Sequence, residues 1–179
     1  PFAIMCYGRL SRKGKGTSIV VKAARRLYKK GFAVNLLLFD APLDDKGRQQ
    51  IKDFNPGLPF EFILDHPVEN NAELFKRADV FVAVEKKGGW SNTAAEAMAA
   101  GVPLIASNTG TNDFLTHNVT GLKVWRHSFF VERAIRKLMG NIALQQKLAH
   151  NGREKMKQYS WESLAAFIIH FIDERLKEK

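Results

Sequence analysis

The sequence predicts a doubly wound α/β domain with a mostly parallel, six-stranded sheet and a helical C-terminal tail. Short apolar runs, bounded by Gly, Pro, Asp or Asn, alternate with helical patterns over residues 1–127. These runs are almost continuously apolar, as strands buried on both faces of a parallel sheet must be. Residues 128–179 contain no strand pattern and are expected to form helices. No linker or repeat divides the chain, so residues 1–179 are expected to form a single domain.

The six expected strands lie in the first part of the chain. They are rich in Val, Ile, Leu and Phe, and turn-forming residues flank them. In chain order they are residues 2–7 (FAIMCY), 32–39 (FAVNLLLF), 60–64 (FEFIL), 80–84 (VFVAV), 102–107 (VPLIAS) and 121–125 (GLKVW).

The clearest expected helix covers residues 17–30. Apolar residues recur on one face and basic residues on the opposite face, which is typical of a helix packed on a sheet. Gly31 follows where a helix often ends in a left-handed residue. The apolar face holds Ile19, Val20, Ala23, Ala24 and Leu27, and the basic face holds Lys22, Arg25, Arg26, Lys29 and Lys30.

Residues 128–179 predict three helices. Asn141 and Gly152 offer helix breaks, and Ser160 is placed to cap the last helix. The apolar stripe of that helix is wider than one packing face requires, so we expect it to leave an apolar patch exposed. The stripe consists of Leu164, Phe167, Ile168, Phe171 and Ile172, widened by Ala165, Ala166 and Ile169.

The charge balance points to an anionic partner. The 28 Lys and Arg residues outnumber the 18 acidic residues and give a net charge of +10. Phosphate groups of a small ligand, an anionic membrane or nucleic acid would fit, and so would a protein that is merely basic at its surface. No nucleic-acid reader motif is present, so no nucleic acid is expected.

Several protein classes are excluded or disfavoured by composition. The single cysteine, Cys6, excludes a disulfide framework, and the five histidines have no metal-ligand spacing, so no metal site is expected. No apolar run approaches the ~20 residues of a membrane span, and no signal peptide is recognisable. We therefore expect a cytoplasmic protein.

A glycine-rich basic loop, Gly8–Gly16 (GRLSRKGKG), directly follows the first expected strand. Ligands of doubly wound sheets bind beyond the carboxyl ends of the strands. The helix beginning near Thr17 would present free backbone N–H groups there, which suits phosphate. The loop matches neither the dinucleotide nor the P-loop fingerprint, so a solvated basic turn is the alternative. Its cations are Arg9, Arg12, Lys13 and Lys15.

A second glycine loop follows the strand at 80–84 and leads into an Ala-rich helix ended by Gly101. A second helix N-terminus therefore points to the same edge of the sheet. Glu96 is placed to bind a ligand, but its spacing from Thr93 is also that of a capping box, in which Glu96 would only close the helix start. The loop contains Gly88, Gly89, Trp90, Ser91 and Asn92.

These loops, in this order, resemble the C-terminal, donor-binding domain of glycosyltransferase family 4, whose Rossmann-like sheet is one half of the GT-B fold. The resemblance covers nearly the whole chain, and EAMAAGVPLIAS is its most specific part. The similar segments are GRLSRKGKGTSIVVKA, ELFKRADVFVAV, GGWSNTAAEAMAAGVPLIAS, GTNDFLTHNVTGLKV and YSWESLAAF.

The resemblance implies roles for individual residues. Arg9 and Lys15 would hold the donor diphosphate and stabilise it as it leaves, with Lys13 as the alternative to Lys15 because the loop is one residue longer than usual. Glu96, with Asn92 and Thr93, would bind the nucleotide, Glu96 through the ribose hydroxyls. Loop 88–91 would face the sugar and the diphosphate.

One position departs from the family pattern. The first Glu of the family's E-x7-E element lies at the transferred sugar and would fall at position 88. This sequence has Gly88 there, and Glu85 lies three residues earlier.

The resemblance implies the nucleotide-sugar-binding half of a retaining glycosyltransferase. Such an enzyme moves a hexosyl group from a nucleoside diphosphate to an acceptor, as in polysaccharide or glycolipid synthesis, without a metal or other cofactor. The N-terminal acceptor domain is absent from this chain, so the chain alone is expected to be inactive. The basic helix at 17–30 could hold the protein on the inner face of an anionic membrane. The alternative is a non-catalytic nucleotide- or polyanion-binding module with a degenerate sugar site, which Gly88 would explain.

Overall fold

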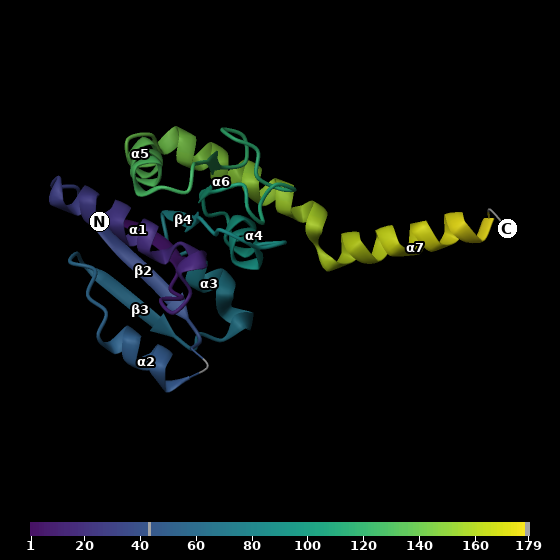
Figure 1. The fold of residues 1–179 in the computed structure, drawn as a ribbon. Helices are drawn as coiled ribbons and strands as arrows, with labels where there is room; N and C mark the ends of the chain where they lie inside the picture. The colour runs from purple at the N-terminus through teal and green to yellow at the C-terminus, as the bar shows by residue number, and fades with distance from the viewer. Residues whose placement is uncertain (43, 178–179) are drawn as a thin grey trace.

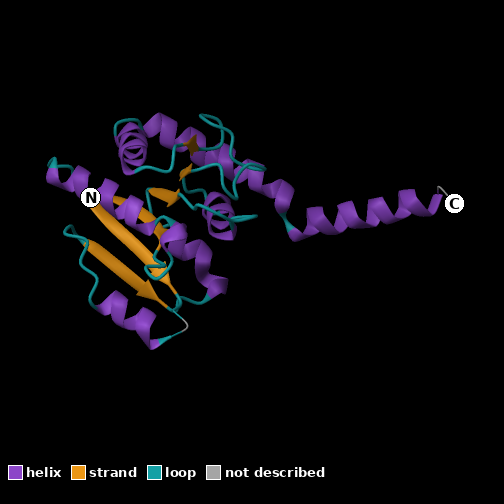
Figure 2. Ribbon diagram, in the orientation of Figure 1, coloured by secondary structure: helices purple, strands orange, loops and turns teal. Residues whose placement is uncertain are grey.

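The computed structural model describes residues 1–42 and 44–177, and its strands and helices alternate as expected (Figures 1 and 2). The strands form one six-stranded parallel sheet in the order β3-β2-β1-β4-β5-β6, which confirms the predicted fold class. The order reverses at β1, which pairs with β2 on one side and with β4 on the other. The strands are β1 (Phe2–Tyr7), β2 (Val34–Asp40), β3 (Phe60–Leu64), β4 (Val80–Ala83), β5 (Leu104–Ala106) and β6 (Leu122–Lys123).

Helices cover both faces of the sheet. Helices α1 and α5 contribute to the core on one face, and α3 and α4 contribute to the core on the other. The helices are α1 (Thr17–Lys29), α2 (Asp45–Lys52), α3 (Asn71–Phe75), α4 (Asn92–Ala99), α5 (Ser128–Met139), α6 (Ile142–Met156) and α7 (Trp161–Lys177), with short 3-10 turns η1 (Lys13–Lys15), η2 (Val68–Asn70) and η3 (Lys157–Tyr159).

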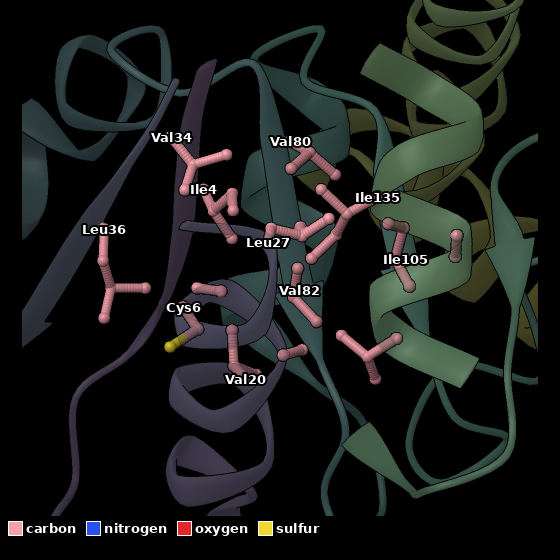
Figure 3. Packing of buried hydrophobic residues seen from close by; sticks show 14 of the residues in the cluster. Ile4, Cys6, Val20, Leu27, Val34, Leu36, Val80, Val82, Ile105 and Ile135 are labelled. Atoms are coloured by element: carbon pink, nitrogen blue, oxygen red, sulfur yellow. The ribbon is translucent and has the colours of Figure 1, made fainter. Parts of the chain in front are cut away.

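Alternate residues of β1 enter the two cores. Ile4 and Cys6 pack among side chains of α1 and α5, including Leu27 and Ile135 (Figure 3), whereas Met5 belongs to the core on the opposite face. Burial raises the pKa of the Cys6 thiol to about 12. Cys6 therefore stays protonated at neutral pH and acts as a small apolar core residue.

The C-terminal helices follow the prediction except at Gly152. The Asn141 side chain accepts a hydrogen bond from the Leu144 N–H (2.8 Å) at the start of α6, and Ser160 Oγ accepts one from the Ser163 N–H (3.1 Å) at the start of α7. Gly152 does not break a helix but lies buried inside α6.

The reason for Gly152 is close packing between helices. A Cβ there would lie 3.2 Å from Met98 Cε of α4 and 3.3 Å from the Thr120 carbonyl oxygen. The missing side chain lets α6 pack closely on α4, which the sequence pattern alone could not distinguish from a break.

Helix α7 extends away from the rest of the domain (Figure 1) and confirms the expected apolar patch. Every residue of α7 is exposed, including Phe167 (65%), Phe171 (52%) and Ile172 (50%). Within the described part of the chain, no helix combines the length and hydropathy that crossing a membrane would require. Positions 178 and 179 of the expected tail lie outside the described residues.

The expected basic face of α1 is not a continuous free surface. Arg25 donates a hydrogen bond to the Pro56 carbonyl, and Arg26 donates one to Ser128 Oγ (3.2 Å). Lys30 forms an ion pair with Glu132 of α5. These contacts hold α1 against its neighbours. Lys22, Lys29 and Lys30 are the exposed cations of this face, and Lys30 is already paired with Glu132, so a membrane contact would depend mainly on Lys22 and Lys29.

Gly16 joins η1 to α1 in a left-handed conformation (φ +84°), and a Cβ there would lie 2.3 Å from the Val84 carbonyl oxygen. We predict that Gly16→Ala lowers the free energy of unfolding by about 2 kcal/mol or more, because left-handed strain alone costs ~1–2 kcal/mol and steric overlap adds to it. Urea denaturation followed by circular dichroism measures this loss.

Two glycines serve as matched controls for that substitution. Gly31 is also left-handed (φ +82°) but has open space around it, so Gly31→Ala should show only the ~1–2 kcal/mol of backbone strain. Gly14 has neither a positive φ nor a neighbour within 4 Å, so Gly14→Ala should change stability by about 0.5 kcal/mol or less. Equal effects at all three positions would contradict the proposed contact with Val84.

Candidate functional site

Three loops meet beyond the carboxyl ends of β1, β4 and β5. The Lys86 N–H donates to the Gly14 carbonyl (2.8 Å), which ties the loop after β4 to the loop after β1. The Ser91 N–H donates to the Gly110 carbonyl (2.8 Å), which ties the loop after β4 to the loop after β5. The loops after β1 and β4 flank the point where the strand order reverses, where doubly wound sheets bind their ligands.

The structure brings Arg9 and Lys15 together over the ring of Tyr7. The Arg9 Cζ atom lies 5.1 Å from the ring centroid, and the Lys15 Nζ atom lies 5.8 Å from it. Each cation also has a buried carboxylate partner. Arg9 Nε contacts Asp40 Oδ1 at 3.0 Å, and Lys15 Nζ contacts Glu85 Oε2 at 2.9 Å. Two cations from one loop are thus each held near the same ring by a buried carboxylate.

The charge state of this cluster follows from its contacts. Burial by itself lowers the pKa of Arg9, but the hydrogen bond and the charge of Asp40 outweigh it and raise that pKa, so Arg9 stays charged. Burial, followed by the negative charge of Asp40, raises the pKa of the Tyr7 hydroxyl. Tyr7 therefore remains neutral near pH 7 and accepts a hydrogen bond from the Arg9 guanidinium.

Lys15, rather than Lys13, is the lysine that shares the Tyr7 ring with Arg9. The Lys13 side chain is exposed, whereas its backbone carbonyl accepts a hydrogen bond from Arg126 Nη2 (3.0 Å). Arg126 Nε also donates to the Val84 carbonyl (2.8 Å). Arg126 therefore fixes the basic turn against the end of β4, and with it the backbone that carries Lys15. Sequence reasoning missed Arg126, because no motif marks a lone arginine after the last strand.

The capping-box interpretation of Glu96 is wrong. Helix α4 begins at Asn92 with Ser91 as its N-cap, so Thr93 is already inside the helix and Glu96 lies in its second turn. Instead, Glu96 Oε2 accepts a hydrogen bond from Asn71 Nδ2 (2.8 Å), at the start of α3. The carboxylate of Glu96 is partly exposed and is oriented by a neighbouring helix, and the sequence analysis did not identify Asn71.

Ser91 has a buried hydroxyl group without a partner. The residue is 6% exposed, and its Oγ atom makes no hydrogen bond with any described residue. Buried polar groups in folded proteins are almost always hydrogen-bonded, to protein or to another molecule. Ser91 lies at the N-terminus of α4, where backbone N–H groups also lack helical partners.

Trp90 is part of the same loop but packs away from the two cations. Its ring centroid lies 4.7 Å from that of Phe114 and 4.9 Å from that of Tyr159, just before α7. Trp90 therefore anchors the loop to the base of the C-terminal helix. The glycines beside it, Gly88 and Gly89, line an open hollow of about 410 Å³ together with Asn108, Thr109, Gly110, Asn112 and Asp113.

Comparison with known proteins identifies a family for most of the chain. Residues 1–155 match the family described as "Glycosyl transferases group 1". The capsular polysaccharide biosynthesis glycosyltransferase CapM of Staphylococcus aureus is 28% identical over 185 residues, covering 97% of this chain and 47% of CapM. The chain spans less than half the length of the curated relatives it matches, between 40% and 47%.

Solved structures show the same fold. The C-terminal domain of LpcC, a glycosyl transferase group 1 family protein from Francisella tularensis, has a TM-score of 0.71 and 24% identity, covering 88% of this chain and 85% of that domain chain. Sucrose-phosphate synthase from Thermosynechococcus elongatus has a TM-score of 0.79 and 25% identity, covering 99% of this chain and 46% of the synthase. HepE of Anabaena, solved with UDP and glucose, has a TM-score of 0.75 and 19% identity, covering 99% of this chain and 48% of HepE.

The six-stranded parallel sheet with its helical tail is thus a GT-B glycosyltransferase domain fold. With residues 1–155 matched to one family, the chain belongs to the glycosyl transferases group 1 family.

Proposed function

We propose that this chain is the donor-binding domain of a retaining hexosyltransferase of glycosyltransferase family 4, which transfers a hexosyl group from a nucleoside diphosphate to an acceptor. The observation that carries the proposal is the pairing of Arg9 and Lys15 over Tyr7, beside the loop that opens α4. Two fixed cations next to two helix N-termini form a site for a diphosphate.

The two cations would act on the leaving group. When the bond between the sugar and the diphosphate breaks, negative charge grows on the diphosphate. Arg9, Lys15 and the free N–H groups at the starts of α1 and α4 are the positive groups positioned to stabilise it. The proposal assigns charge compensation to these groups and to no metal ion or other cofactor. Removing one preorganised donor of this kind typically costs ~3 kcal/mol in the transition state.

The nucleoside would bind along α4 and α3. Glu96 is held by Asn71 through one carboxylate oxygen, Oε2, and its carboxylate can accept hydrogen bonds from ribose hydroxyls. Asn92 and Thr93 lie in the first turn of α4, close to the same ligand in this proposal. HepE was solved with UDP, so UDP is the first nucleotide to test.

The acceptor site would lie on a separate N-terminal domain. This chain corresponds to less than half of its curated relatives, and the apolar face of α7 is exposed. We propose that the missing domain covers part of this face and completes the cleft in which transfer occurs, so that this chain alone is inactive. CapM is a capsular polysaccharide enzyme, and a polysaccharide or glycolipid acceptor fits the proposal.

One observation favours a second function, a non-catalytic polyanion-binding module. A groove of about 500 Å³ runs along α1 and includes no acidic residue in its lining. A polyanion could bind there without any sugar chemistry. Transfer of a hexosyl group by the full-length protein would decide between the two functions. The cations that line the groove are Arg9, Arg12, Lys13, Lys22 and Arg25.

We predict that Lys15→Ala weakens UDP binding about tenfold and leaves uridine binding unchanged, because the target of Lys15 is the charge of the diphosphate. Calorimetry at low and high salt measures both ligands, and the loss should shrink as salt screens the interaction. Lys13→Ala is the matched control, since Lys13 lies in the same turn but is exposed. A larger effect of Lys13→Ala than of Lys15→Ala would reverse the assignment.

We predict that Glu96→Gln weakens UDP binding about fivefold, because an amide accepts fewer hydrogen bonds from the ribose than a carboxylate does. The variant should still fold, since the glutamine oxygen can accept the hydrogen bond from Asn71. The 2′-deoxy analogue of UDP is the control ligand and should lose little affinity. Unchanged calorimetric affinity for UDP, GDP and ADP in folded Glu96→Gln would rule out the ribose contact.

A further inference from the structure

Glu85 is a nearly buried acid just after β4, and it has no role in the proposed reaction. Its side chain is 11% exposed, and Oε2 lies 2.9 Å from Lys15 Nζ. Its backbone is fixed, because the Glu85 carbonyl accepts a hydrogen bond from Ser107 Oγ (3.1 Å). A buried carboxylate is unfavourable unless it is paired, so Glu85 and Lys15 stabilise each other.

The Glu85 carboxylate lies directly against Gly88. A Cβ built on Gly88 would be 3.3 Å from Glu85 Oε2 and 3.9 Å from Thr109 Cγ2. Gly88 and Thr109 both line the open hollow of about 410 Å³. The absence of a side chain at position 88 therefore makes room for the carboxylate of Glu85 at the edge of this hollow.

The position of Lys15 places the hollow next to the transferred sugar. In a nucleotide sugar, the sugar is bonded to the distal phosphate, and the proposed function assigns Lys15 to that diphosphate. A group within ion-pair distance of Lys15 is then within reach of the sugar. Among the described residues, the Glu85 carboxylate forms its ion pair through Oε2. A carboxylate can accept several hydrogen bonds, so it can bind Lys15 and a sugar hydroxyl together.

We infer that Glu85 binds a hydroxyl group of the transferred sugar and is a specificity-determining residue for it. This inference rests on the proposed donor site. The competing role is that of a counter-ion, in which Glu85 only neutralises Lys15. The two roles predict different responses. If Glu85 is only a counter-ion, its loss frees Lys15 and changes the affinity for the diphosphate equally with or without a sugar. If Glu85 contacts the sugar, its loss lowers the affinity only for ligands that carry the sugar.

The test compares nucleoside diphosphates with their sugar derivatives in wild type and Glu85→Gln. UDP, GDP and ADP are titrated by calorimetry. The nucleoside diphosphate that binds is then compared with its hexose derivatives. We expect Glu85→Gln to bind the free diphosphate as tightly as wild type or more tightly. The Kd ratio of the preferred sugar nucleotide to the free diphosphate should rise about fivefold, the difference between a charged and a neutral hydrogen bond.

Glu132→Gln is the matched control, because Glu132 is also buried (4% exposed) and paired with a lysine, Lys30, but lies on α5. Its Kd ratio should equal that of wild type. A rescue variant tests whether a carboxylate at the neighbouring position can replace that of Glu85. Glu85→Ala should lose the preference for the sugar, and Glu85→Ala/Gly88→Glu should regain part of it, because a carboxylate then starts from the neighbouring position.

The outcomes separate the two proposals. Equal changes for the free diphosphate and all sugar nucleotides in folded Glu85→Gln would reduce Glu85 to a counter-ion and overturn the inference, while the donor site would stand. If wild type binds none of UDP, GDP and ADP, both the donor site and the role of Glu85 are overturned.

Discussion

The reversal of strand order at β1 is the constraint on which the site depends. Because β1 pairs with β2 on one side and with β4 on the other, the chain must cross from one edge of the growing sheet to the other side of β1. The helices that follow β1 and β4 therefore lie on opposite faces, and the loops that precede them meet at the carboxyl edge of the sheet. A glycine in a left-handed conformation, Gly16, lets the first loop pass within contact distance of the end of β4.

Ion pairs then hold the two cations of the first loop in place. Arg9 and Lys15 are each neutralised by a carboxylate from a neighbouring part of the sheet, Asp40 at the end of β2 and Glu85 just after β4. Two cations near one aromatic ring repel each other, and the two carboxylates offset that repulsion. The two acids therefore keep the cations in place.

The same loop links the site to the end of the chain. Trp90 packs against Tyr159, which lies just before α7 begins. Tyr159 in turn donates a hydrogen bond to the Asp113 carbonyl (2.7 Å) in the loop after β5. The glycine loop, the loop after β5 and the root of α7 therefore share contacts. The apolar residues of α7 make no comparable contacts with this domain, because the helix extends beyond it (Figure 1).

The sequence predicted the strands, the two glycine loops and the exposed apolar helix, because apolar periodicity and glycine positions are local properties of the chain. It did not identify Gly152 as a packing residue, or the partners that hold Arg25, Arg26 and Lys30. Those depend on which helices become neighbours.

The polar contacts of the site depend on the tertiary structure. The spacing of Glu96 from Thr93 allowed Glu96 to close its own helix, and the family resemblance placed the sugar-contacting Glu at position 88, three residues after Glu85. In the folded chain Glu96 contacts Asn71, and the carboxylate of Glu85 reaches Gly88 and Lys15. Lys15 and Glu85 are seventy residues apart in the chain, and Asn71 and Glu96 are twenty-five apart. Such pairs form because parallel strands bring their carboxyl ends to one edge, and no local pattern records which side chains meet there.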